Sequence, residues 1–350
     1  MAIAMMVLNV YAKNLEVTIV PAGSTSDTTQ DVIVKLQYRN TGQKKINIVK
    51  WYLPGKELYD PLFKITCNNV PVEYLGPMIK RVKASAKDVI PLAPGKIIST
   101  VVALSSAYDM SKTCDYSIQY NMQSDLIIFS DDQTLETIPD EPIDNLESEI
   151  QSNNIQLPIK GRPNKQHNQN QIMTIHKRAA TLNFVSCTDN NTIDLINAVS
   201  WALKYANESF NYLNNIISGT TRYTTWFGTY SSTNRNTVKT HFQNMVAVFN
   251  SKNITFDCTC TDPGVYAYVY PSTPYKIYLC GVFWRTTMTG TDSKAGTLVH
   301  ETSHFPAVGG TKDYAYGQTA CKNLATKKPG QAILNADSHE YFAENTPYNP

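Results

Sequence analysis

The 350-residue chain has no marked excess of either charge, no long apolar run and no CxxC motif. Its 31 lysines and arginines nearly balance 29 aspartates and glutamates, which argues against a nucleic-acid or membrane partner. No apolar stretch reaches the roughly 18 residues that a membrane span requires. Apolar residues make up 42% and charged residues 17%, so we expect folded globular domains rather than a disordered chain.

None of the seven cysteines belongs to a CxxC pair, which argues against a cysteine-ligated zinc site. Cys258 and Cys260 flank one residue and would point to the same face of a strand, so we expect them to have different partners. Such a pattern is typical of disulfides and predicts a secreted, extracellular protein. The alternative is a set of buried, reduced thiols in a cytosolic protein.

Residues 1–123 contain β-branched and aromatic runs, such as DVIVKLQYRN and IISTVVALS, separated by Gly, Pro, Asn and Asp turns. Their regular spacing predicts an all-β, immunoglobulin-like sandwich. Cys67 and Cys114 both lie in this region, where one disulfide between them would fit.

Residues 124–178 are acidic at first, then polar and basic, with few large apolar side chains, and we interpret them as a linker that contains an activation cleavage region. Residues 179–350 combine helical periodicity, as in TIDLINAVSWALKYANESF, with three short strands. This region therefore predicts an α+β domain.

The stretch GTLVHETSHFPAVGGTKDYAYG contains two of the six histidines. On a helix, His300 and His304 share a face and can bind one metal ion, while Glu301 lies beside them, placed to reach a water molecule. Catalytic zinc needs a third protein ligand. Position 310 is glycine rather than histidine, and the later segment CKNLATKK offers no glutamate, so Asp313 is the predicted third ligand of one Zn²⁺ per chain.

HETSH followed by GGTKDYAYG resembles the HExxH plus GTxDxxYG signature of the aspzincin (deuterolysin, M35) metalloendopeptidases, and especially the peptidyl-Lys enzymes. Segments such as FDCTCTDPGVYAYVYP and NADSHEYFAENTP extend the likeness over residues 187–347. The resemblance implies a zincin-type domain with zinc on His300, His304 and Asp313. It also implies that Glu301 is the general base and that Tyr316 donates a hydrogen bond to the oxyanion.

The resemblance further implies disulfides between Cys187 and Cys258 and between Cys260 and Cys280. Cys321 has no counterpart in that pattern, so we expect a free buried thiol.

The aspartate that matches Asp337 is implicated, in the peptidyl-Lys enzymes, in binding the lysine that follows the cleaved bond. Glu340 lies on the same helical face and would assist, although a solvated acidic face is the more common meaning of such a pair. We therefore expect cleavage of Xaa-Lys bonds in peptide or protein substrates. Replacement of Asp337 is expected to remove the lysine preference and leave zinc bound.

Some bacterial relatives carry a β-rich propeptide before this domain, and the chain resembles such a secreted toxic proenzyme. We therefore expect a monomer whose prodomain inhibits the protease until self-processing, with Lys80 or Lys83 of GPMIKRVKASAKD in the acidic pocket. The alternative is a catalytically silent relative in which the sandwich serves binding or adhesion. A virulence role and a nutritional role both remain open.

Overall fold

The computed structural model describes residues 14–82, 84–123, 127–129, 149–162, 173–177 and 180–349. The chain forms two compact units. Unit 1 comprises residues 1–76 and 84–167, and unit 2 comprises residues 77–83 and 168–350. Residues 77–83, a short segment of the N-terminal region, fold as part of unit 2, and the domain bounds at 123 and 178 stay a prediction.

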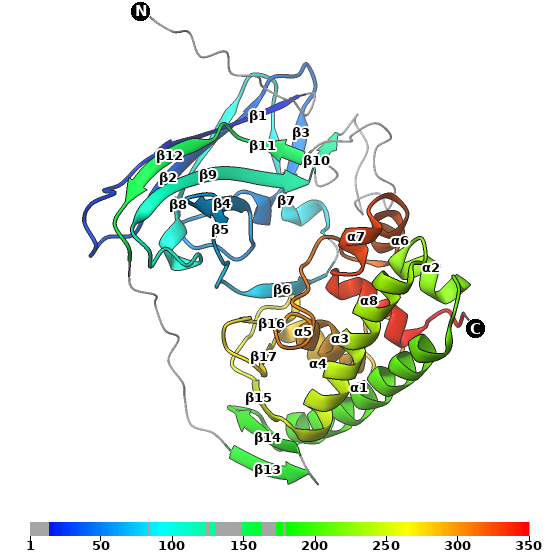
Figure 1. Cartoon of the computed structure of the whole chain (residues 1–350). Coiled ribbons are helices and arrows are strands. Elements are labelled where there is room, and N and C mark those ends of the chain that lie inside the picture. Colours follow the sequence, from blue (N-terminus) through cyan, green and yellow to red (C-terminus); the bar gives the residue numbers. More distant parts are fainter. Residues whose placement is uncertain are drawn as a thin grey trace, which may run out of the picture. The chain divides into compact units, whose positions relative to one another are not determined.

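Unit 1 is built from strands, as its alternating apolar residues predict (Figure 1). The strands are β1 (Leu15–Pro21), β2 (Ile33–Asn40), β3 (Ile46–Val49), β4 (Phe63–Cys67), β5 (Val70–Pro71), β7 (Val89–Leu92), β8 (Ile97–Ala103), β9 (Cys114–Gln123), β10 (Ile127–Phe129), β11 (Glu149–Gln151) and β12 (Ile155–Ile159). They form sheets in the orders β1-β2-β8, β10-β3-β7 and β11-β9-β4-β5, with β12 also paired to β9. An immunoglobulin-like topology for this unit stays a prediction.

Part of the predicted linker, residues 124–178, forms strands instead. β11 and β12 both pair antiparallel with β9. Ile150 and Ile159 are each 1% exposed. A few apolar side chains at the right positions are enough to attach a polar segment to a sheet, and bulk composition does not detect them.

Unit 2 contains a six-stranded sheet in the order β13-β14-β15-β17-β16-β6. Its strands are β6 (Met78–Arg81), β13 (Met173–Lys177), β14 (Ala180–Val185), β15 (Asn253–Asp257), β16 (Val265–Val269) and β17 (Lys276–Leu279). β14, β15 and β17 are parallel, whereas β16 is antiparallel to both β17 and β6. Figure 1 shows the cyan strand β6 beside the yellow strand β16.

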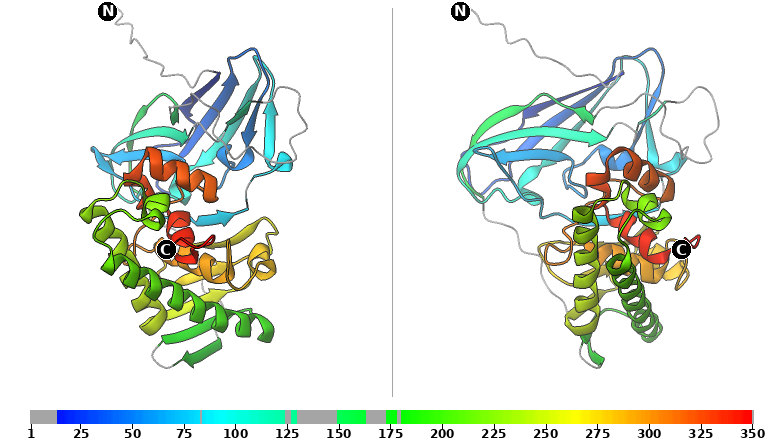
Figure 2. Two further views of the ribbon diagram at one scale, coloured as in Figure 1. Left: turned by 90° about the vertical axis from the view of Figure 1, so that its right-hand side faces the viewer. Right: turned by 45° about the vertical axis from the view of Figure 1, so that its right-hand side comes forward.

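The helices of unit 2 include α1, which contains the segment TIDLINAVSWALKYANESF that the sequence predicts to be helical. They are α1 (Asp189–Asn215), α2 (Thr221–Phe227), α3 (Ser232–Ser251), α4 (Gly281–Arg285), α5 (Lys294–Ser303), α6 (Gln318–Lys327), α7 (Pro329–Ala332) and α8 (Ala336–Glu344). The long helices α1 and α3 lie side by side (Figure 2). α5 packs against both α1 and α8, and all of its residues are buried. No helix in the described part of the chain combines the length and the apolar character that crossing a membrane requires.

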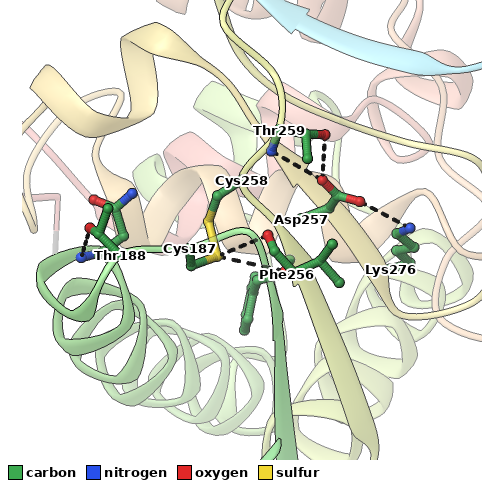
Figure 3. The surroundings of a disulfide bond; sticks show 9 residues. Cys187, Thr188, Phe256, Asp257, Cys258, Thr259 and Lys276 are labelled. Carbon is green, nitrogen blue, oxygen red and sulfur yellow. Dashed lines mark hydrogen bonds and ion pairs between the residues drawn. A yellow bond between two sulfur atoms is a disulfide. The ribbon is translucent and has the colours of Figure 1, made fainter. Parts of the chain in front are cut away.

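The described residues form three disulfides, in the pairs Cys67–Cys114, Cys187–Cys258 and Cys260–Cys280. Cys187 lies two residues after the end of β14 and Cys258 directly follows β15, so the disulfide joins the ends of these parallel strands (Figure 3). Beside this bond, the Asp257 carboxylate accepts a hydrogen bond from Thr259 and pairs with Lys276 of β17 at 3.1 Å.

We expect the two disulfides of unit 2 to stabilise it unequally, because they close loops of 71 and 20 residues. Loop entropy predicts that the free energy of unfolding falls by about 4 kcal/mol in the Cys187→Ala, Cys258→Ala double variant. In the Cys260→Ala, Cys280→Ala double variant it should fall by about 3 kcal/mol. Urea unfolding of the full chain in a Trp51→Phe background, followed by the fluorescence of Trp201, Trp226 and Trp284 in unit 2, measures both losses. A larger loss from the shorter loop would contradict this account.

Candidate metal-dependent active site

Helix α5 and its C-terminal capping residue place His300 and His304 on one buried face, with exposures of 0% and 1%. Both rings face the Asp313 carboxylate, which lies in the loop after the helix. Asp313 Oδ1 is 3.2 Å from His300 Nε2 and 3.5 Å from His304 Nε2. The three side chains that the sequence suggests as ligands therefore meet at one point.

These three atoms fit a zinc ion. Each of them is buried and has no hydrogen-bond partner in the described part of the chain. Unpartnered buried polar atoms are uncommon, because desolvation without a partner costs free energy. In a tetrahedral zinc site with bonds of about 2.0–2.1 Å, neighbouring ligand atoms are about 3.3 Å apart, which matches the separations here.

Each imidazole is oriented through its other nitrogen. Burial lowers the pKa of His304 to about 4, so the ring is neutral, and its Nδ1 donates to Thr311 O at 3.0 Å. His300 Nδ1 lies 2.7 Å from Asp337 Oδ1. Both contacts leave Nε2 directed at Asp313, which is how outer contacts orient the ligands of metal sites.

The loop that carries Asp313 and Tyr316 is fastened to the start of α8. Asn335 Oδ1 accepts hydrogen bonds from Tyr314 N at 2.9 Å and Ala315 N at 3.0 Å. Gly310 has a φ of +58°, a conformation that favours glycine, and this supplies the turn between α5 and the loop. Asn335 was not among the predicted site residues, since a single asparagine outside a motif carries no recognisable signal.

Glu301 and Tyr316 complete the predicted catalytic set. Glu301 is fully buried, and burial raises its pKa well above the usual value. Neither of its carboxylate oxygens has a hydrogen-bond partner among the described residues. The Tyr316 hydroxyl donates to the backbone carbonyl of Ile79 in strand β6, at 2.9 Å.

The side chain of Lys80, the residue after Ile79, enters an acidic pocket in unit 2 and is 1% exposed. Its Nζ lies 2.8 Å from Glu340 Oε2, 3.1 Å from Asp292 Oδ1 and 3.4 Å from Asp337 Oδ1. The Tyr266 ring centre is 4.9 Å away. Burial alone would lower the pKa of Lys80, but the carboxylates outweigh it and hold the pKa well above its ordinary value.

The pocket brings together Lys80, Asp337 and Glu340 as the sequence predicts, with two additions. The shorter ion pair belongs to Glu340 rather than to Asp337. Asp292 was missed, because a lone aspartate in a turn has no diagnostic spacing. Lys83, the other lysine considered, lies outside the described residues. Cys321 is buried and is not part of a disulfide.

Comparison with known proteins agrees with this geometry. Residues 212–344 match the model of the aspzincin M35 family, described as lysine-specific metallo-endopeptidase. An extracellular protease of Aeromonas hydrophila is 39% identical over 325 residues, which cover 91% of this chain and 90% of that protein.

A peptidyl-Lys metalloendopeptidase of Armillaria mellea is 42% identical over 262 residues, covering 73% of this chain and 68% of that protein. A solved zinc peptidase from Grifola frondosa is 52% identical and covers 47% of this chain and all of its own, with a TM-score of 0.46.

We predict that Asn335→Ala weakens metal binding, although Asn335 is not itself a ligand. Without the two hydrogen bonds, the loop no longer holds Asp313 against the histidines, and affinity for Zn²⁺ should fall about 10- to 100-fold. Competition with a chelator, followed by metal analysis, measures the change. The matched control is Asn236→Ala on the exposed side of α3, and equal affinities in the two variants would contradict the prediction.

Proposed function

Because the chain belongs to the aspzincin family and is a zinc metalloendopeptidase, we propose that it hydrolyses peptide bonds on the N-terminal side of lysine. One observation carries this proposal. The Tyr316 hydroxyl donates a hydrogen bond to the carbonyl of Ile79 in strand β6. The side chain of the following residue, Lys80, fills the acidic pocket. The groups that would recognise a substrate therefore flank the Ile79–Lys80 peptide bond.

We assign the zinc ligands to His300, His304 and Asp313. Zn²⁺ bound there supplies Lewis-acid chemistry, which polarises the scissile carbonyl and makes water a stronger nucleophile. Glu301 accepts a proton from the attacking water and passes it to the nitrogen of the departing lysine residue as the C–N bond breaks. The Tyr316 hydroxyl donates to the substrate oxygen as negative charge develops there.

Lysine selectivity follows from the electrostatics of the pocket. Asp337 and Glu340 are 1% and 0% exposed, so water screens their charges poorly. An ammonium group neutralises them, whereas a neutral side chain would leave buried carboxylates unpaired, which is costly. The pocket therefore favours lysine over an apolar residue of similar length.

The same geometry supports synthesis as an inhibited, self-processing proenzyme. β6 occupies the strand position beside β16, and Lys80 occupies the pocket that a substrate lysine would need. Residues on both sides of segment 77–83 belong to unit 1, so the segment is held at both ends. The disulfides, together with the extracellular Aeromonas hydrophila relative, support export. The alternative of a catalytically silent protein is set aside, because the chain is a metalloendopeptidase with every predicted catalytic residue present.

We expect Glu340→Gln and Asp337→Asn to have different consequences. Glu340→Gln should lower kcat/KM for an Xaa-Lys peptide about 100-fold, because a buried charge pair is lost. Asp337→Asn should lower zinc retention more than Glu340→Gln does, because Asp337 Oδ1 lies 2.7 Å from His300 Nδ1 and Glu340 Oε2 lies 3.3 Å from it. This second contact replaces the simpler expectation that zinc stays bound when Asp337 is changed.

Peptide cleavage and metal analysis of each variant measure these two effects. Glu208→Gln, at an exposed glutamate of α1, is the matched control for the loss of a charge. If Glu340→Gln retains the wild-type preference for lysine, Glu340 does not take part in lysine recognition.

Release of Lys80 should activate the full chain. Lys80→Ala is expected to shorten the time before added peptide is cleaved, whereas Lys64→Ala, at an exposed lysine of unit 1, should leave it unchanged. Glu301→Ala should remain unprocessed when incubated with zinc. Mass spectrometry of the products identifies the new N-terminus, and continued processing of Glu301→Ala would show that another protease performs the maturation.

A further inference from the structure

We propose that Asp292 is a third lysine-recognising carboxylate of the pocket, and that Glu344 is the positioning residue that holds it in place. The inference rests on the proposed function and adds to it two residues from different parts of unit 2.

Asp292 completes the surroundings of the ammonium group. Its Oδ1 lies 3.1 Å from Lys80 Nζ and accepts a hydrogen bond from the Tyr341 hydroxyl at 2.9 Å. An ammonium group has three N–H donors, and three separate carboxylates surround this one. This arrangement matches a lysine better than the planar fork of an arginine.

Asp292 also lies at the open side of the pocket. Its side chain is 35% exposed, compared with 2% for Asp337 and 0% for Glu340. An incoming lysine would therefore meet the Asp292 carboxylate while the ammonium is still partly hydrated. The two deeper carboxylates complete the ion pairs after desolvation.

The backbone of Asp292 needs support, because its φ is +53°, in the left-handed region that is unfavourable for residues with a side chain. Glu344 provides that support from the end of α8. Its Oε2 accepts from Asp292 N at 3.1 Å, and its Oε1 accepts from Ser293 N at 2.9 Å and Ser293 Oγ at 2.8 Å. One carboxylate therefore binds two successive backbone N–H groups of the turn.

Space for this contact depends on Gly296, one helical turn before His300. A Cβ at this position would lie 2.0 Å from Glu344 Oε1 and 3.0 Å from Glu340 Oε1. Glu344 is seven residues after Asp337 and four after Glu340, so all three lie on one face of α8. This face supplies two carboxylates of the pocket directly and positions the third through the turn.

The first experiment measures Lys80 in the full chain and does not depend on catalysis. In a Glu301→Ala background, the rate of Lys80 acetylation is followed by mass spectrometry, with exposed Lys64 as the internal reference. Asp292→Asn should raise the relative rate about tenfold, because one hydrogen bond to a charged group is lost. Asp189→Asn, an exposed aspartate in α1, should not change it. An unchanged rate in Asp292→Asn would overturn the role of Asp292.

The second experiment compares two peptides that differ only in lysine or methionine after the cleaved bond. Both Asp292→Asn and Glu344→Gln should lower the lysine-to-methionine ratio of kcat/KM, about tenfold for Asp292→Asn, with zinc content unchanged. Glu208→Gln should retain the ratio. If kcat/KM of Glu344→Gln falls equally for both peptides, Glu344 only stabilises the fold. If kcat/KM stays at the wild-type value for both peptides, Glu344 has no positioning role either.

The two proposals fail in different ways. A wild-type protein that does not prefer lysine would contradict the proposed function, while the acetylation of Lys80 would still decide whether Asp292 holds the ammonium group. A wild-type protein with lysine preference and an Asp292→Asn variant that matches it in both experiments would contradict only the further inference.

Discussion

The carboxylate of Asp337 is the group that connects the histidines, the acidic pocket and the Tyr316 loop of unit 2. Its Oδ1 lies 2.7 Å from His300 Nδ1 and 3.4 Å from Lys80 Nζ, while its Oδ2 accepts a hydrogen bond from Gly317 N at 2.8 Å. One side chain of α8 therefore orients an imidazole of α5, contributes to the acidic pocket and fastens the end of the loop that carries Tyr316. The proposed metal centre and the proposed specificity pocket both contact Asp337, so a change in one site alters the other.

Such a concentration of buried charge explains why a lysine from the N-terminal region belongs to this unit. Asp337 and Glu340 would repel each other in a medium of low polarity if no cation were present. Lys80 neutralises them from strand β6, and β6 is held by backbone pairing with β16. The inhibitory contact that we propose would thus also stabilise the folded unit.

The placement of segment 77–83 also bears on regulation. Lys80 lies in the pocket, and Tyr316 donates a hydrogen bond to the carbonyl of the preceding residue. The segment is therefore bound as a substrate would be. Because both flanks of the segment belong to unit 1, a cut in the chain far from the segment does not by itself remove it from the pocket. In the proposed proenzyme, release would therefore depend on the affinity of the pocket for Lys80, and the residues that select a substrate would also set the strength of inhibition.

The sequence by itself determined the features that depend on local spacing. A four-residue interval places His300 and His304 on one face of α5, and a three-residue interval does the same for Asp337 and Glu340 on α8, because the α-helix repeats every 3.6 residues. Tertiary structure decided what those faces meet. Lys80 and Asp337 are 257 residues apart in the chain, and their contact was expected from the predicted lysine preference rather than from any spacing. The support of Asp292 by Glu344 and the pairing of β11 and β12 with β9 are likewise long-range contacts. Such contacts arise when distant segments pack together, and a single sequence carries no periodic signal for them.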